Sequence, residues 1–335
     1  MKRLLLLLLA GLLLLIPIAG CAKQQEGKPV GMAVEFNAHS ACAYISQDKG
    51  WYEKEGLTLS AYETYATGMA LAAALARGDI GVAYICLVPA INAYANAGVP
   101  IKIVAGTHKY GYGLVVNPDK IKTVKDLEEP GIRLGCIREG GAVDVLMHKM
   151  IDKYHLDAGK VLANVQRMDP SKQVLAIKMG QLDAGFLPEH WATMTEGFGF
   201  SMLLTSQAVW PEMQGSVLVV KQELIDNQPE TVKKLVDVAQ KATDWANKHP
   251  EEAAEIMARQ LQAAGGEFPS DAPEGIAKLE ITPEVMLKSM GRLDYTTDID
   301  PKEVQATIDY IAGLGYIKSS FNAADILDLS FLEGK

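Results

Sequence analysis

Two adjacent glycines carry the clearest chemical signal in the 335-residue sequence. Gly140 and Gly141 follow a short apolar segment and precede an expected helix over 142–154. Glycine lets the backbone approach a ligand closely, and the free N–H groups at a helix start favour an anion. Arg138 and Glu139 add one charge of each sign immediately before the glycines. The segment predicts ligand binding at a helix start, and the alternative is a plain turn into a helix.

Side chains with complementary chemistry follow other apolar segments. Glu189 can accept a hydrogen bond from an N–H group of a ligand, and Trp210 can stack on a flat ring. The expected ligand-binding residues are His39, Ser40, Cys42, Tyr84, Cys86, Arg138, Glu139, Gly140, Gly141, Glu189, His190 and Trp210. Acidic, basic and aromatic groups together suit a zwitterionic or amino-heteroaromatic ligand, such as an aminosulfonate or a thiamine-precursor pyrimidine.

Three cysteines lie at the carboxyl ends of expected strands. We expect Cys42 and Cys86 to lie close together at the ligand site, with Cys136 facing them across a cleft. Free cysteine commonly serves as a small apolar residue, and a Cys42–Cys86 disulfide is the alternative in an exported protein. Their spacing carries no metal signature, and no Walker A, HExxH, CxxC or catalytic-triad pattern occurs. The sequence therefore predicts no cofactor, no metal and no enzymatic activity.

Strand-like and helix-like segments alternate along the chain. Alternation of this kind indicates parallel βαβ units, whose strand ends open onto a ligand crevice. The expected strands cover 29–36, 56–64, 80–86, 101–105, 132–137, 165–168, 182–187 and 217–220. The expected helices cover 42–51, 66–77, 89–97, 123–127, 142–154, 171–179 and 229–248, one that begins at 250, and 301–312. Residues 263–282 show no pattern and are expected to form a surface loop.

The N-terminus predicts export and lipid attachment. Lys2 and Arg3 precede the apolar run Leu4–Ile16, which is too short for a comfortable membrane span. The run ends in Ile-Ala-Gly-Cys21, which resembles a lipobox. We expect a signal peptide over 1–20, lipidation of Cys21 and a tether over 21–28; an uncleaved anchor and a plain signal are the alternatives.

Charge and length narrow the class of protein further. The net charge is −9, and removal of the signal leaves 30 basic and 41 acidic residues, a net charge of −11. An acidic chain without basic blocks argues against nucleic acid as a partner. The length exceeds one typical core, so two lobes are expected.

Five short segments occur in a fixed order along the first half of the chain. They are QDKGWYEKEGL at 47–57, ARGDIGVA at 76–83, VPIKIVAG at 99–106, KDL at 125–127 with the strand through Gly135, and KMGQLDA at 178–184. Together they resemble the taurine, nitrate, alkanesulfonate and thiamine-precursor binding proteins, a branch of the type II periplasmic binding fold. The resemblance implies an α/β fold of two lobes with a hinge and a central cleft. It places residues 29–112 and 219–335 in lobe one and 113–218 in lobe two, with crossovers near 107–113 and 215–222.

This resemblance also implies a function. It implies an extracytoplasmic lipoprotein, expected to be a monomer, that binds a small organic solute and delivers it to the permease and ATPase of an ABC importer. Two segments depart from the family: Pro188-Glu189-His190-Trp191 stands where relatives often read WEP, and Gly141-Ala142 where they often place Ser or Thr. The alternatives are a ligand-binding sensor for a membrane receptor and a pyrimidine synthase of the yeast type. The latter needs a cysteine-rich motif that this sequence lacks.

Overall fold

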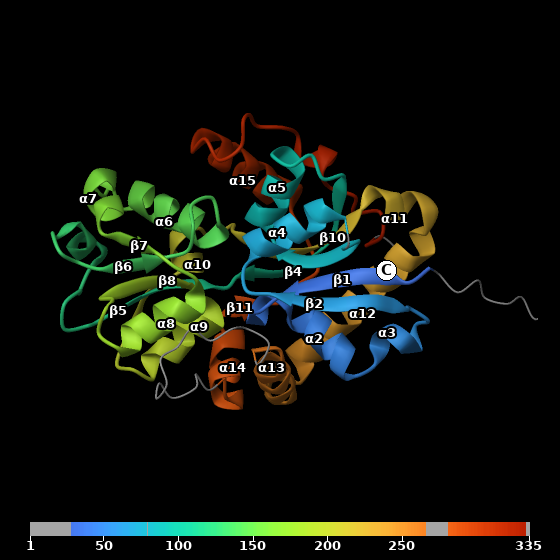
Figure 1. The fold of residues 1–335 in the computed structure, drawn as a ribbon, viewed down its shortest axis with the longest axis horizontal. Helices are drawn as coiled ribbons and strands as arrows, with labels where there is room; N and C mark the ends of the chain where they lie inside the picture. The colour runs from blue at the N-terminus through green and yellow to red at the C-terminus, as the bar shows by residue number, and fades with distance from the viewer. Residues whose placement is uncertain (1–27, 79, 266–280, 333–335) are drawn as a thin grey trace, which may run out of the picture.

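The chain folds into two α/β lobes, each built on one sheet (Figure 1). The computed structural model describes residues 28–78, 80–265 and 281–332. The first sheet has the order β11 (Leu293–Asp294), β4 (Ile101–Tyr110), β10 (Gln214–Lys221), β3 (Val82–Cys86), β1 (Val30–Glu35) and β2 (Leu59–Tyr65). The second sheet has the order β7 (Val165–Arg167), β6 (Leu134–Cys136), β8 (Ala184–Pro188), β5 (Tyr112–Val116) and β9 (Ser201–Thr205). The expected two-lobe α/β architecture is confirmed.

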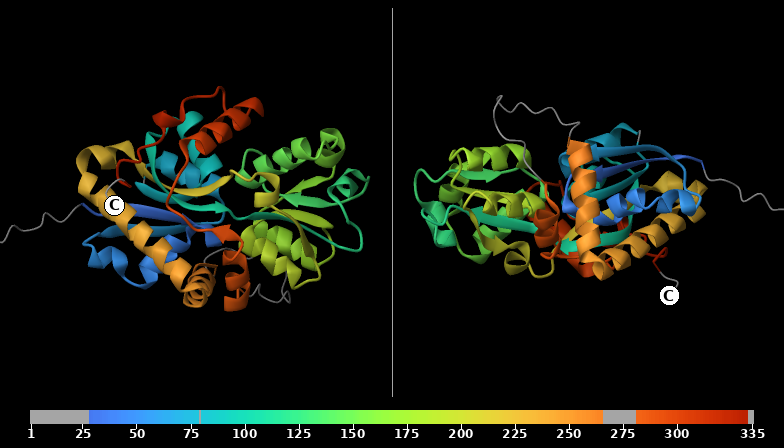
Figure 2. Two further views of the ribbon diagram at one scale, coloured as in Figure 1. Left: turned by 180° about the vertical axis from the view of Figure 1, so that it is seen from behind. Right: turned by 90° about the horizontal axis from the view of Figure 1, so that it is seen from below.

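Helices cover both faces of each sheet (Figure 2). The first lobe begins with η1 (Ala38–Ser40), α2 (Ala41–Asp48), α3 (Trp51–Lys54), α4 (Gly68–Arg77) and α5 (Leu87–Ala95). The second lobe contains η2 (Val124–Glu128), α6 (Ala142–Lys153), α7 (Ala158–Ala163), α8 (Pro170–Lys178), α9 (Glu189–Glu196) and α10 (Ser206–Val209). The C-terminal third adds α11 (Gln222–Asn227), α12 (Pro229–Lys248), α13 (Pro250–Gly265), α14 (Pro283–Met290), α15 (Pro301–Gly313) and η3 (Ala323–Asp325).

In both sheets an antiparallel strand follows three parallel strands; beyond it lie β4 and β11 in the first sheet and β9 in the second. In the first sheet β1 pairs in parallel with β2 and β3, and β10 runs antiparallel beside β3. In the second, β6 pairs in parallel with β7 and β8, and β5 runs antiparallel beside β8. The carboxyl ends of the parallel strands in each sheet are the edge at which open α/β sheets bind ligands.

The chain crosses between the lobes twice. The first crossover is a sharp turn at Tyr110 and Gly111, which have φ angles of +65° and +85°. A Cβ at residue 111 would lie 2.7 Å from the His39 Nε2, so only glycine fits this position. The second crossover lies between β9 and β10. Because all of β10 pairs in the first sheet, the expected boundary at residue 218 falls inside a strand of lobe one.

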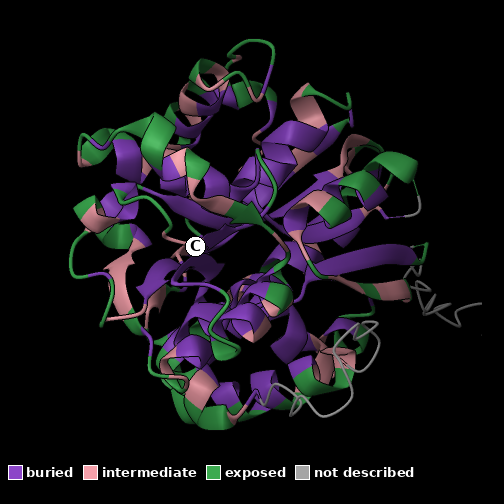
Figure 3. Cartoon of the chain, turned by 60° about the vertical axis from the view of Figure 1, so that its left-hand side comes forward, coloured by how far each residue is buried: buried purple, intermediate pink, exposed green. Residues whose placement is uncertain are grey.

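Buried apolar residues form two clusters on opposite faces of the sheets. Met32 and Val34 of β1 belong to one cluster, and the intervening Ala33 belongs to the other. This alternation follows from the two-residue period of a strand, and it buries the central strands on both faces (Figure 3). No helix in the described part of the chain is both long and apolar enough to cross a membrane. The expected signal peptide and Cys21 lie outside the described residues.

Candidate ligand-binding site between the lobes

A small cavity lies where the two lobes meet. Its volume is about 30 Å³. The first lobe contributes Glu35, Asn37, Ala66, Thr67, Gly68, Met69, Cys86 and Pro89. The second contributes Tyr112, Ile137, Arg138, Gly141, Ala142, Val143, Asp169, Pro170, Pro188 and Trp191. A water molecule needs roughly 10–15 Å³, whereas pockets for small organic ligands measure about 300–1,000 Å³. The lobes are therefore closed on one another, and a larger solute would enter only after they separate.

Five helices begin at this cavity. The residues that line it include the starts of α4 at Gly68, α6 at Ala142 and α8 at Pro170, and the residues just before α5 and α9, namely Cys86 and Pro188. The partial positive charge of a helix start favours an anionic group. Arg138 adds a full positive charge, whereas the carboxylate of Asp169 opposes it. The lining thus offers separate places for negative and positive groups of one ligand.

Glu35, at the end of β1, sits in a dense hydrogen-bond network on the cavity floor. Its Oε1 accepts from the backbone N–H of Cys86 at 2.6 Å, and its Oε2 accepts from Asn37 Nδ2 at 3.0 Å and from Cys86 Sγ at 3.1 Å. Burial raises the pKa of the Glu35 carboxyl. Gly68 makes this packing sterically possible, since a Cβ there would lie 2.5 Å from Glu35 Oε1.

The Cys86 thiol is the centre of this floor. Tyr112 Oη donates to Cys86 Sγ at 2.9 Å, and Ser216 Oγ lies 3.5 Å from it. Burial raises the pKa of the Cys86 thiol well above its ordinary value. The Nδ1 of His39 lies 3.7 Å from Cys86 Sγ, while its Nε2 faces the Gly111 carbonyl oxygen at 2.6 Å. Burial lowers the pKa of His39 to about 4, so the ring is neutral at pH 7.

Three of the expected binding residues line the cavity, namely Cys86, Arg138 and Gly141. His39 lies against Cys86 behind the floor, and the adjacent Ser40 is buried, with no hydrogen-bond partner for its Oγ within the described ranges. Glu139 does not line the cavity: its side chain is 75% exposed and lies 3.8 Å from the Arg167 guanidinium. Gly140 has a φ of +75°, and its carbonyl oxygen accepts a hydrogen bond from Asn92 Nδ2 of α5 at 3.2 Å.

The other expected binding residues lie away from the cavity lining. Cys42 and Tyr84 pack in the apolar cluster on the opposite sheet face from Cys86, where the Tyr84 hydroxyl faces that of Tyr52. Strand alternation and the start of α2 thus separate Cys42 from Cys86, and all three cysteines 42, 86 and 136 are free thiols. Trp210 packs against Tyr310 with ring centroids 5.6 Å apart.

Two further expected residues, Glu189 and His190, are buried in the first turn of α9. Glu189 accepts from Arg292 Nη1 at 3.0 Å and from Thr193 Oγ1 at 2.7 Å. His190 packs against Trp191, with ring centroids 4.6 Å apart, and burial lowers its pKa to about 3. It is the neighbouring Trp191 that reaches the cavity. A helix that starts at residue 189 explains this, because consecutive residues point in different directions around it.

Sequence reasoning missed several lining residues, above all Glu35 and Tyr112. One signal was present: Glu35 is a carboxylate at the carboxyl end of an otherwise apolar strand. Thr67 and Gly68 were assigned to a helix interior, whereas Thr67 is the N-cap of α4 and its side chain accepts from the Ala70 N–H. A threonine N-cap followed by glycine, directly after a strand, would have marked this second helix start.

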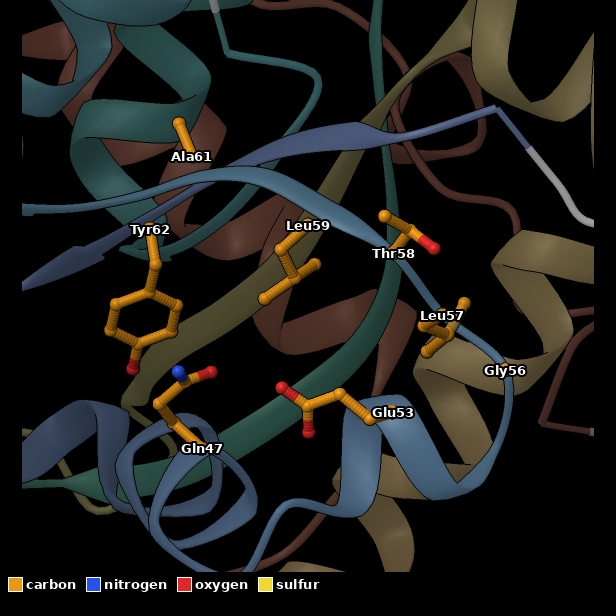
Figure 4. Close-up of a pocket in the computed structure, with 8 residues that line it drawn as sticks. All are labelled: Gln47, Glu53, Gly56, Leu57, Thr58, Leu59, Ala61 and Tyr62. Carbon is orange, nitrogen blue, oxygen red and sulfur yellow. The ribbon is translucent and has the colours of Figure 1, made fainter.

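A larger hollow of about 430 Å³ lies elsewhere, under the edge strand β2 (Figure 4). It is lined by Gln47, Glu53, Gly56, Leu57, Thr58, Leu59, Ala61 and Tyr62. All of these residues come from one stretch of the first lobe, and the polar ends of Gln47, Glu53 and Tyr62 point into the hollow. Closure of the lobes does not shape this hollow, so the interlobe cavity is the stronger candidate despite its smaller volume.

The fold and the interlobe site define a two-lobed binding protein of the type II periplasmic binding fold. Residues 23–261 match the sequence model of the NMT1-like family. The chain belongs to this family. The expected family and fold class are therefore confirmed.

Individual relatives share less than 30% of their sequence with this chain. A candidate binding protein of Brucella abortus is 28% identical over 258 residues, which span 73% of this chain and 75% of that protein. A zinc-bound ligand-binding component of an ABC-type import system from Staphylococcus aureus superimposes with a TM-score of 0.74 at 17% identity, covering 92% of this chain and 99% of that one. The alkanesulfonate-binding protein of Xanthomonas axonopodis pv. citri, bound to MOPS, gives 0.72 at 15% identity, with coverage of 90% and 99%.

Proposed function

We propose that this protein is the extracytoplasmic solute-binding component of an ABC importer. The observation that carries the proposal is the cavity that both lobes line, because enclosure between two lobes is the way in which a hinged binder traps its solute. The structural relatives that are import components share this architecture. The chain acts as a binding protein and not as an enzyme.

The solute that fits best carries both an anionic and a nitrogen-bearing group. Helix starts and Arg138 suit the anion, while Asp169 suits an amine or ring N–H, and Trp191 with Tyr112 suits a flat ring. An aminosulfonate and a thiamine-precursor pyrimidine both meet this description. Because the cavity is small in the closed structure, the lobes must open to admit either.

The remaining parts of the proposal concern location and partners. The lipobox supports anchoring to the outer side of the cell membrane through Cys21 after removal of the signal peptide. The partners are then the permease and ATPase of the importer, which would engage a monomeric, closed, loaded protein. A sensor that docks on a membrane receptor would use the same closure.

The test is native mass spectrometry of the freshly purified protein, followed by thermal melting with taurine and with an aminopyrimidine thiamine precursor. We expect a small organic molecule to co-purify, or one probe to raise the melting temperature. If no small organic molecule co-purifies and neither probe raises the melting temperature, the proposed solute class is wrong. Stimulation of ATP hydrolysis by the reconstituted permease–ATPase complex separates the importer from the sensor, which predicts no such stimulation.

A further inference from the structure

Three metal-binding side chains meet on the cavity floor. Glu35 ends β1, His39 lies in η1, and Cys86 ends the neighbouring strand β3. One donor atom from each lies within 4.8 Å of the others, and all three residues are buried. Carboxylate oxygen, imidazole nitrogen and thiolate sulfur are the three ligand types that zinc takes in proteins. Sequence spacing does not reveal this set of residues. The parallel pairing of β1 with β3 is what brings Cys86 next to Glu35 and His39.

Neighbouring groups hold each donor in a metal-binding orientation. His39 Nε2 is 2.6 Å from the Gly111 carbonyl oxygen, which can only accept, so Nε2 carries the proton and Nδ1 keeps its lone pair. That lone pair faces Cys86 Sγ. Glu35 is held by the Cys86 N–H and by Asn37. A second shell of this kind is what orients the ligands of protein metal sites.

Two of the three donor distances are close to those around a tetrahedral ion, and Glu35 and His39, whose donor atoms lie within 4.8 Å of each other, would move closer together on binding. With Zn–S near 2.3 Å and Zn–N near 2.0–2.1 Å, sulfur and nitrogen on one tetrahedral ion lie roughly 3.6 Å apart. The distance from His39 Nδ1 to Cys86 Sγ is 3.7 Å. The distance from Cys86 Sγ to Glu35 Oε2 is 3.1 Å and would widen by a few tenths of an ångström once the thiol proton leaves.

Charge balance fits as well. A divalent ion with one carboxylate and one thiolate is neutral, which a buried site favours because an unbalanced charge is costly there. Hydrogen bonds from Tyr112 and Ser216 to the sulfur would further stabilise the thiolate.

We infer that Glu35, His39 and Cys86 bind one divalent transition-metal ion of the zinc class. Glu35 and Cys86 line the cavity, so the fourth coordination position faces it and is open to water or to an oxygen or nitrogen of a bound solute. The inference goes beyond the solute-binding function and does not depend on it, since the ion would bind in the absence of solute.

The test uses the purified protein after chelation of any bound metal. We expect calorimetry with Zn²⁺ to show a single site. With Co²⁺ we expect a near-ultraviolet charge-transfer band that reports a thiolate ligand. Cys86→Ser should abolish that band, and Cys86→Ser, His39→Gln and Glu35→Gln should each weaken Zn²⁺ binding by more than about 100-fold. Loss of a direct ligand should exceed the roughly 10- to 100-fold cost of losing a second-shell partner.

Cys42→Ser and Cys136→Ser are the matched controls, because both replace buried free thiols outside the cluster. Both should keep the band and the affinity. Absence of stoichiometric binding to the wild-type protein, or a band that survives Cys86→Ser, would overturn the inference. If Cys86→Ser does not fold, protection of Cys86 from alkylation by Zn²⁺ in the wild-type protein decides the matter. Native mass spectrometry reads the organic solute separately, so a failed metal site leaves the proposed function untouched.

Discussion

At the scale of single residues, Glu189 shows how burial outweighs an ion pair. Burial raises the pKa of this carboxyl to about 7, although Arg292 and Thr193 both donate to it and lower the pKa. An unfolded glutamate has a pKa near 4.3, so the folded state binds the extra proton between about pH 4 and pH 7. Stability contributed by this proton is therefore present at low pH and is lost as the pH rises through about 7.

We predict that Glu189→Gln removes this loss, because a neutral amide mimics the protonated acid. Chemical denaturation should show that the variant gains stability relative to wild type between pH 5 and pH 8, by up to roughly 3 kcal/mol. Glu196→Gln is the control of opposite sign. Burial opposes ionisation of Glu196, but hydrogen bonds from Lys288 and Arg292 lower its pKa overall, so this variant should lose stability above about pH 4. Parallel pH profiles for wild type and Glu189→Gln would contradict the prediction.

At the scale of elements, the sequence predicted the long amphipathic helices and the parallel strands well. The helix expected over 229–248 is α12, and the strand expected over 29–36 is β1. Periodicity did not reveal β5 and β9, whose places in the sheet depend on pairing with distant strands. Residues 188–191 were expected to form a loop at the cleft, but α9 begins at Glu189, and Glu189 and His190 are buried in its first turn. The helix start after Gly141 was predicted because its glycines are a local signal.

That helix start supplies a test of the cavity. A Cβ at residue 141 would lie 2.6 Å from Ile137 Cδ1, a side chain that also lines the cavity. We predict that Gly141→Ala displaces Ile137 and lowers occupancy by the co-purified solute in native mass spectrometry by about tenfold or more, since a misfit of this kind costs roughly 1–3 kcal/mol. Far-ultraviolet circular dichroism should be unchanged, because the φ of Gly141 is −81° and is accessible to alanine.

Gly313→Ala is the matched control, because it adds a Cβ at the end of α15 with nothing within 4 Å. Its solute occupancy should equal that of the wild-type protein. Equal occupancy in Gly141→Ala would instead show that this helix start is only a turn and does not contact the solute.

At the scale of the whole molecule, Arg292 joins the lobes outside the cavity. It follows α14 and immediately precedes β11 of the first sheet, yet it bonds to α9 of the second lobe (Figure 1). Its Nη1 donates to Glu189 Oε1 and Thr193 Oγ1 at 3.0 Å, and its Nη2 donates to Glu196 Oε1 at 2.9 Å. Arg292 is mostly buried, so these bonds are stronger than an exposed pair and favour the closed arrangement.

We predict that Arg292→Met opens the lobes, because methionine keeps the apolar stem and removes every one of these bonds. Small-angle scattering should show a larger radius of gyration for the solute-free variant, and native mass spectrometry should show weaker solute retention. Lys233→Met is the control, since Lys233 pairs with Asp237 within the exposed face of α12 and touches neither the cavity nor the second lobe. An unchanged radius of gyration in Arg292→Met, with the melting temperature lowered alone, would show that Arg292 stabilises the fold without holding the lobes together.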